Sequence, residues 1–148
     1  MKRVIIANDH GAIDIKRKLT RHLEDRGFSV DNLGVDSEDS VDYPDIAREA
    51  CERFLADGNY DFGIVCCGTG IGISMSANKV KGIRCALPQN IYAARMAKEH
   101  NNANFIAFGG RIDYPDPAEK MLDTFIDSNF AGDRHARRVD KIMGIESC

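Results

Sequence analysis

The sequence predicts an α/β protein built on a doubly wound parallel sheet of five strands, with helices on both faces. Two patterns lead to this fold class. Short apolar runs of strand length alternate with stretches whose apolar residues recur at helical spacing, and the alternation continues along nearly the whole chain. The clearest strand-like run is apolar without a break, which is typical of a parallel sheet covered on both faces.

The first two strand and helix pairs lie in the N-terminal part of the chain. Residues 2–9, KRVIIAND, are predicted as a short buried strand, and residues 13–27 as a helix, because apolar residues recur there at helical spacing before a glycine. FSVDNLG, residues 28–34, is the second strand. The second helix spans residues 42–58, where a proline near the start, an acidic first turn and a final glycine mark its ends.

The middle of the chain repeats the pattern twice. YDFGIVCC, residues 60–67, is the continuous apolar strand, and it is followed by a glycine turn and a helix over residues 73–80. GIRCAL, residues 82–87, and the helix over residues 89–101 form the fourth pair. The repetition predicts that these strands lie side by side and parallel.

The last strand is NFIAFGG, residues 104–110. Apolar residues at i, i+3, i+4, i+7 and i+8 then predict a helix over residues 118–126, and a closing helix surrounds residues 139–143. The sequence has no internal repeat or linker-like segment, so residues 1–148 are predicted to form a single domain.

Composition narrows the class of protein. The formal net charge is −3 with acids and bases interspersed, which argues against a nucleic-acid partner. No apolar segment is long enough to cross a membrane, and the first apolar run is too short for a signal peptide, so we expect a cytoplasmic protein without a membrane partner. Five cysteines without a CxxC pair indicate reduced thiols rather than a disulfide framework.

The turn after the third predicted strand is a candidate anion site. In CGTGIG, residues 67–72, the glycines let consecutive N–H groups converge, and the following helix adds its positive terminus. The spacing G-x-G-x-G differs from the dinucleotide fingerprint, and no GK[ST] follows. A tight turn without a ligand is the alternative interpretation.

Cys67 is the first residue of this turn. The N–H groups that attract an anion would also stabilise its thiolate, so Cys67 is a candidate base or nucleophile. Cys66 still lies in the strand and is interpreted as a small buried apolar residue.

Two histidines are further candidates. His10 follows Asp9 at the end of the first strand, and His100 ends a helix in the run EHNNAN. A histidine beside a loop is more often structural than catalytic, and the second one shifts that balance only modestly. Because no spacing of His, Cys, Asp and Glu matches a familiar metal pattern, we expect no metal and no other cofactor.

Positive side chains gather on the closing helix. Arg134, Arg137, Arg138 and Lys141 share one helix face, and Arg111 follows the last strand. Guanidinium groups at i and i+4 can bind one phosphate from two sides, which arginine's forked donors favour. A solvated charged face is the alternative.

Several motifs occur in one order across nearly the whole chain: DH, DYPD, CGTGIGIS followed by ANK, GIR, EHN with NANF, FGGR and GDRHARRVDKI. In this the chain resembles the ribose-5-phosphate isomerase B family, which also contains the galactose-6-phosphate isomerase subunits. The resemblance implies a Rossmann-like three-layer α/β/α fold and a metal-free aldose–ketose isomerisation of a phosphorylated sugar. It also implies a homodimer with active sites between subunits, and such dimers could pair into a tetramer.

The resemblance assigns roles to individual residues. Cys67 takes the place of the base that moves a proton between C1 and C2, Thr69 that of a hydroxyl that assists transfer among the substrate oxygens, and His100 that of the residue that opens the furanose ring. The backbone of residues 68–72 would hold the enediolate. The substrate-binding positions are Asp9, His10, Tyr43, Gly68, Gly70, Ile71, Gly72, Asn101, Arg111, Arg134 and Arg138. Among these, His10 and the three arginines match positions that bind phosphate.

Departures from the family pattern concern the preferred sugar. The chain has Asn102 where the usual form is HND, Pro88 where a small residue or cysteine is usual, and no aromatic residue after DHGA. One branch of the family uses a glutamate base four residues beyond the cysteine position. Here that residue is Ile71, which favours Cys67 as the base.

Three alternatives stay open at this point. The substrate could be ribose 5-phosphate or a six-carbon sugar phosphate such as allose 6-phosphate or galactose 6-phosphate. The chain could also be a non-catalytic phosphosugar-binding module, since fold does not decide function. A redox-responsive cysteine protein is a weaker reading, because no resolving CxxC partner is present.

Overall fold

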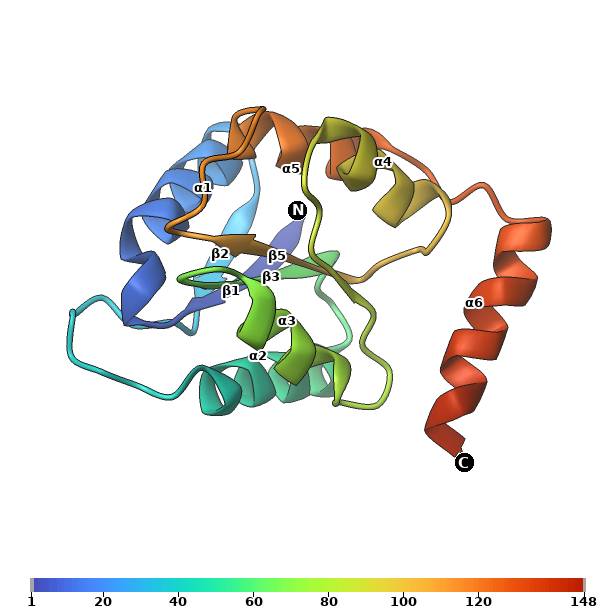
Figure 1. Ribbon diagram of the computed structural model, residues 1–148, viewed down its shortest axis with the longest axis horizontal. Coiled ribbons are helices and arrows are strands. Elements are labelled where there is room, and N and C mark those ends of the chain that lie inside the picture. Colours follow the sequence, from blue (N-terminus) through green and yellow to red (C-terminus); the bar gives the residue numbers. More distant parts are fainter. Residues whose placement is uncertain (1, 148) are drawn as a thin grey trace.

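The computed structural model describes residues 2–147, and within them one five-stranded parallel sheet carries helices on both faces (Figure 1). The doubly wound α/β prediction is confirmed. The strands are β1 Arg3–Asn8, β2 Ser29–Asn32, β3 Phe62–Cys67, β4 Cys85–Ala86 and β5 Phe105–Gly109. The helices are α1 Ile13–Asp25, α2 Tyr43–Asp57, α3 Ile71–Asn78, α4 Ile91–Glu99, α5 Ala118–Asp127 and α6 Arg134–Gly144, with the 3₁₀ turns η1 His10–Ala12 and η2 Ile145–Ser147.

The strand order is β2-β1-β3-β5-β4. The chain leaves β1 toward β2 on one side and later continues from β3 toward the other side. In open α/β sheets such a reversal leaves a crevice beyond the carboxyl ends of the two central strands, where ligands bind. Asn8 pairs with Cys66 near those ends, so the segments that follow β1 and β3 flank this crevice.

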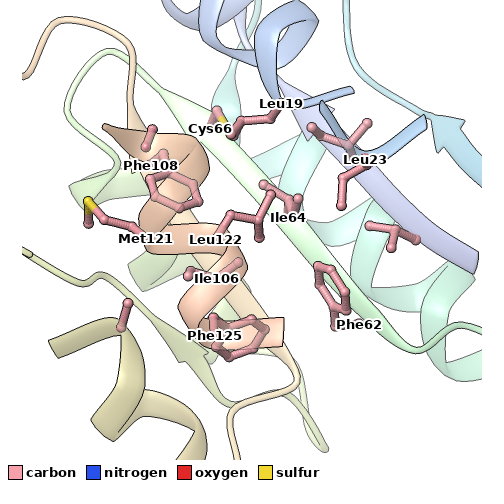
Figure 2. Packing of buried hydrophobic residues seen from close by; sticks show 14 of the residues in the cluster. Leu19, Leu23, Phe62, Ile64, Cys66, Ile106, Phe108, Met121, Leu122 and Phe125 are labelled. Atoms are coloured by element: carbon pink, nitrogen blue, oxygen red, sulfur yellow. The ribbon is translucent and has the colours of Figure 1, made fainter. Parts of the chain in front are cut away.

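Side chains that alternate along the central strands form two apolar cores, one on each face. On the first face, α1, α4 and α5 cover Ile64, Cys66 and Phe108 (Figure 2). On the second, α2 and α3 cover Val65 and Cys67. The two adjacent cysteines of β3 therefore face opposite layers of the protein.

The first core is closed by aromatic packing at its centre. Figure 2 shows Leu122 and Phe125 of α5 directed toward the strands, beside Phe62 and Ile64. The rings of Phe62 and Phe125 meet edge to face with centroids 5.5 Å apart, a favoured aromatic geometry. This packing fixes the sheet on which the loops at its carboxyl edge are built.

Two predicted elements have different bounds in the structure. The predicted strand over residues 82–87 pairs with β5 only at Cys85 and Ala86, which makes β4 a very short edge strand. Such shortness limits edge-to-edge association of sheets. The helix predicted over residues 73–80 begins at Ile71, so it starts directly after the glycine turn.

The last helix differs from the others in its surroundings. In Figure 1, α6 stands apart from the layered body, on the side away from the carboxyl ends of the strands. Two of its residues, His135 and Val139, are buried. Among residues 2–147, no helix is both long and apolar enough to cross a membrane.

Candidate active site

Three loops meet at the carboxyl edge of the sheet, after β1, β3 and β5. The N–H of Asp9 donates to the carbonyl of Cys66 at 3.1 Å, and the N–H of Arg111 donates to the carbonyl of Gly68 at 2.8 Å. These bonds continue the parallel pairing beyond the ends of the strands. The backbone around Cys67 is therefore held from both sides.

The thiol of Cys67 lies at the start of α3. Its Sγ accepts a hydrogen bond from the N–H of Gly70 at 3.2 Å. Gly70 has φ +77°, a left-handed conformation that glycine adopts without strain, and α3 begins at the next residue. Helix N-termini and N–H donors are the environment in which a thiolate is stabilised. Cys67 is 4% exposed and belongs to the second apolar core, so its sulfur is buried beneath the loop.

The other described cysteines lie in apolar surroundings. Burial raises the pKa of Cys66 to about 12, and that of Cys51 to about 12 as well. Burial also raises the pKa of Cys85. These thiols are inert apolar residues at neutral pH, whereas Cys148 lies outside the described residues.

Two side chains from other segments, those of Arg111 and Tyr43, pack directly against the backbone of the glycine loop. A Cβ added to Gly68 would come within 3.0 Å of Nη1 of Arg111, and one added to Gly72 would come within 2.5 Å of the ring of Tyr43. Arg111 is exposed and Tyr43 is 39% exposed. A cation and a phenol therefore flank the loop with their polar ends accessible to a ligand.

Thr69 lies at the tip of this loop. It is exposed, and its Oγ1 accepts a hydrogen bond from the N–H of Ile71 at 3.2 Å. Since the hydroxyl hydrogen is free to rotate, Thr69 can still donate to an oxygen of a ligand.

Asp9 and His10 close the opposite side of the crevice. Asp9 is buried, and its Oδ1 accepts the N–H of Gly11 at 2.9 Å, which caps the turn η1. Nδ1 of His10 accepts the N–H of Val41 at 3.2 Å. With Nδ1 an acceptor, a neutral His10 carries its proton on Nε2 and can donate it to a ligand. A cavity of about 230 Å³ opens beside His10 and Gly110.

A second group of predicted site residues lies elsewhere in the chain. His100 caps the C-terminal end of α4 and Asn101 follows it, while Arg134 and Arg138 lie on α6. The rings of His100 and His135 stack with centroids 4.0 Å apart and planes 12° apart. The stack joins the end of α4 to the start of α6.

These two groups lie at opposite ends of the sheet. His100 comes before β5, and the carbonyl of Asn104, just before that strand, accepts the N–H of Gly63 at the start of β3. His100 therefore lies at the amino edge, while Cys67 lies at the carboxyl edge. Within one chain, the structure brings Asp9, His10, Tyr43, the loop of residues 67–72 and Arg111 together. It places His100, Asn101, Arg134 and Arg138 away from them.

The sequence patterns did not single out His135 as part of this second group. Burial lowers the pKa of His135, and the neighbouring His100 and the positive charges of Arg134 and Arg138 lower it further. A signal was present, because His135, Val139 and Ile142 recur at i, i+4 and i+7, which places the histidine on the apolar face of this helix.

No three side chains of His, Cys, Asp or Glu in residues 2–147 are grouped closely enough to hold a metal ion. The arrangement at the carboxyl edge instead combines a sulfur, converging N–H groups and a guanidinium. Such a set can take a proton from carbon and stabilise an oxyanion beside a bound anion.

Comparisons with known proteins agree with this chemistry. A family model described as Ribose/Galactose Isomerase matches residues 4–142. The galactose-6-phosphate isomerase subunit LacB of Clostridium acetobutylicum is 40% identical over 143 residues, covering 97% of this chain and 81% of that protein. Ribose-5-phosphate isomerase B of Escherichia coli strain K12 is 36% identical over 146 residues, covering 99% and 97%.

A solved structure matches equally well. The ribose-5-phosphate isomerase B of Clostridium thermocellum superposes with a TM-score of 0.92 at 46% sequence identity, covering 98% of this chain and 97% of that one. The likeness extends over both ends of the sheet and includes α6.

Proposed function

The chain belongs to the Ribose/Galactose Isomerase family of aldose–ketose isomerases, and on this premise we propose that it converts ribose 5-phosphate to ribulose 5-phosphate with Cys67 as the base. The observation that carries the proposal is the hydrogen bond from Gly70 to the Cys67 sulfur at the start of α3. This placement puts the sulfur beside the N–H groups that would face the substrate.

The proton transfer uses groups that lie within a few residues of each other. The Cys67 thiolate removes the proton from C2 of the open aldose and returns it to C1. As it does so, negative charge moves from the sulfur to the substrate oxygens, which the N–H groups of residues 68–72 stabilise without reorganising. The exposed Thr69 hydroxyl passes a proton between O1 and O2.

Binding energy at the phosphate aligns the reacting carbons. Arg111 and His10 lie on the two sides of the crevice and supply a guanidinium and an Nε2–H. Interactions with a remote phosphate can be used to orient C1 and C2 against the base, which raises the rate rather than binding alone.

The active site of this proposal is completed by a second copy of the chain. Cys67 and His100 lie at opposite edges of one sheet, so a single chain cannot present both to one sugar. In a homodimer of two-fold symmetry, His100, Arg134 and Arg138 of the partner subunit would face Cys67. Two exposed apolar residues on one face of α3, Ile71 at 53% and Met75 at 63% exposure, support an interface beside the loop.

In this arrangement the partner subunit's His100 opens the furanose ring, by moving a proton between the ring oxygen and the anomeric hydroxyl. The partner subunit's Asn101 contacts the sugar. Arg134 and Arg138 lie at i and i+4 on α6, where two guanidinium groups can bind one phosphate together with Arg111.

A six-carbon sugar phosphate is the second candidate substrate. The galactose-6-phosphate isomerase subunit LacB, at 40% identity, lies between the two ribose-5-phosphate isomerase B relatives at 36% and 46%. Allose 6-phosphate and galactose 6-phosphate are therefore tested beside ribose 5-phosphate.

The test offers the three sugar phosphates to the purified chain in the presence of EDTA and follows ketose formation. We expect turnover of ribose 5-phosphate with the highest kcat/KM. Faster turnover of a six-carbon sugar would replace the proposed substrate, and absence of ketose from all three would contradict the proposal as a whole. Sedimentation at assay concentration measures the proposed dimer independently.

A further inference from the structure

We infer that Arg84 is a positioning residue for His100: it fixes the turn that carries this histidine and connects the turn to α6. The inference rests on the proposed function, since it concerns the ring-opening half of that reaction. It assigns no contact between Arg84 and the substrate.

The turn after α4 offers two backbone carbonyls, those of Asn101 and Asn102, to an external partner. In this turn Asn102 is left-handed with φ +44°, its N–H bonds the carbonyl of Lys98 at 3.1 Å, and the N–H of Ala103 bonds the carbonyl of Ala97 at 3.0 Å. The carbonyls at the C-terminal end of a helix have no intrahelical donors and carry partial negative charge. The N–H groups of Asn102 and Ala103 close the helix end itself, so an external donor would add a hold on the carbonyls of Asn101 and Asn102.

The guanidinium of Arg84 supplies that partner. Nε donates to the carbonyls of Asn101 at 3.2 Å and Asn102 at 3.1 Å, and Nη2 donates to the carbonyl of Asn102 at 2.6 Å. A cation at this position also complements the helix dipole. The two residues that follow His100 are thus held by a planar fork whose geometry lysine cannot reproduce.

Arg84 is itself held firmly in place. Its backbone N–H donates to Oδ1 of Asn104 at 2.8 Å, and its carbonyl accepts the N–H groups of Asn104 and Phe105, both at 3.1 Å. These bonds attach Arg84 to the start of β5, in the sheet itself. The rigid sheet, rather than a mobile loop, therefore fixes the position of the turn.

The same side chain reaches α6. Nη1 of Arg84 lies 3.4 Å from Sδ of Met143, and His135 at the other end of that helix stacks on His100. His100 is thus fixed from two directions, by the ring of His135 and by the turn that Arg84 holds. Its imidazole is pre-organised before any substrate binds.

Ribulose 5-phosphate provides a test that separates the two halves of the reaction. Because its O5 carries the phosphate, this ketose cannot close a furanose ring. In D₂O, the enzyme base exchanges a C1 proton of ribulose 5-phosphate by forming and collapsing the enediolate, without any ring step. Exchange at C1 of ribulose 5-phosphate, followed by NMR, reports the Cys67 half alone. Ketose formation from ribose 5-phosphate, which enters as a closed furanose, reports the complete reaction.

At saturating ribose 5-phosphate, we expect Arg84→Met to lower ketose formation roughly 100-fold, while C1 exchange of saturating ribulose 5-phosphate changes less than about threefold, since a misplaced group costs rate only in the step it serves. Retained exchange also shows that the variant is folded and that its Cys67 loop is intact. Arg84→Lys should recover only part of the loss. Arg48→Met, which removes an exposed arginine paired with Glu52 on α2, should leave both rates unchanged.

Two results would overturn the inference. If isomerisation and exchange fell in parallel, Arg84 would support the whole site rather than His100. If neither rate fell in Arg84→Met, the turn would need no such support. Absence of isomerisation by the unaltered chain would instead reject the pentose proposal, and the role of Arg84 with it.

Discussion

Replacing Cys67 by alanine separates catalysis from packing, because an adjacent cysteine offers a matched control. Cys67 and Cys66 are neighbours in β3, are 4% and 0% exposed, and face opposite cores. Each change to alanine removes one buried sulfur, which costs about 1 kcal/mol of unfolding free energy. For a chain of 148 residues this lowers Tm by about 3 °C in both variants.

The two variants should differ only in activity. Loss of a general base lowers the rate by roughly 10² to 10⁴-fold, which corresponds to about 3 to 5 kcal/mol of activation free energy. We therefore expect Cys67→Ala to lose nearly all kcat with little change in KM. Cys66→Ala should stay within about threefold of the unaltered chain, since the pKa of Cys66 is raised to about 12 and no thiolate is present to act.

The assay follows ketose formation from ribose 5-phosphate, with calorimetry on the same samples. C1 exchange in D₂O gives a second measure of proton transfer. The assignment of the base would be refuted if Cys67→Ala kept more than about a tenth of the activity, a loss far below that expected for a base. It would also be refuted if Cys66→Ala lost as much activity at equal stability.

Three further predictions concern binding, the glycine loop and acid stability. Arg134→Ala should raise KM at least about tenfold and change kcat less, because it removes one charged contact to the phosphate; an unchanged KM would exclude this contact. Gly72→Ala should leave the free energy of unfolding unchanged or raise it by up to about 1 kcal/mol, yet raise KM, because the new Cβ displaces the Tyr43 ring. If the KM of Gly72→Ala equalled that of the unaltered chain, the Tyr43 ring would not be part of the pocket. The hydrogen bond from the Tyr60 hydroxyl, with help from Arg3, lowers the pKa of Asp31 below its usual 3.8. The stabilisation of the folded chain by the charged Asp31 is therefore complete above about pH 4, and it is lost as the pH falls through the lower pKa that Asp31 has in the folded chain. In denaturant titrations Asp31→Asn should be less stable than the unaltered chain at pH 6, and the difference in the free energy of unfolding should shrink as the pH falls below about 4; a difference that stays constant with pH would contradict the assignment.

The sequence predicted the fold class and the family, and both are confirmed. Continuous apolar runs specify strands covered on both faces, and the order of several motifs identified the family where any single motif would have been weak. The enzyme class is also confirmed by the relatives, in preference to a binding module. Which of the residues act on the substrate stays a prediction.

The sequence pattern did not predict two features of the structure, the order of the strands and the distance of His100 from Cys67. The strand order places β5 between β3 and β4, although the chain makes β4 first, because pairing partners depend on which crossover packs best rather than on local propensity. The separation of His100 from Cys67 likewise follows from the path of α4, which runs back to the amino edge of the sheet. Periodicity predicted that helix but not the edge at which its last residue lies.

The position of α6 has a genetic consequence under the proposed dimer. A chain with a defective Cys67 still has a normal Arg134, and a chain with a defective Arg134 still has a normal Cys67. When the two are co-expressed in equal amounts, half of the dimers are hybrids, and each hybrid rebuilds one normal site, so about a quarter of all sites should function. Two variants that are each impaired alone would then recover activity together, a property that a site contained in one polypeptide does not have.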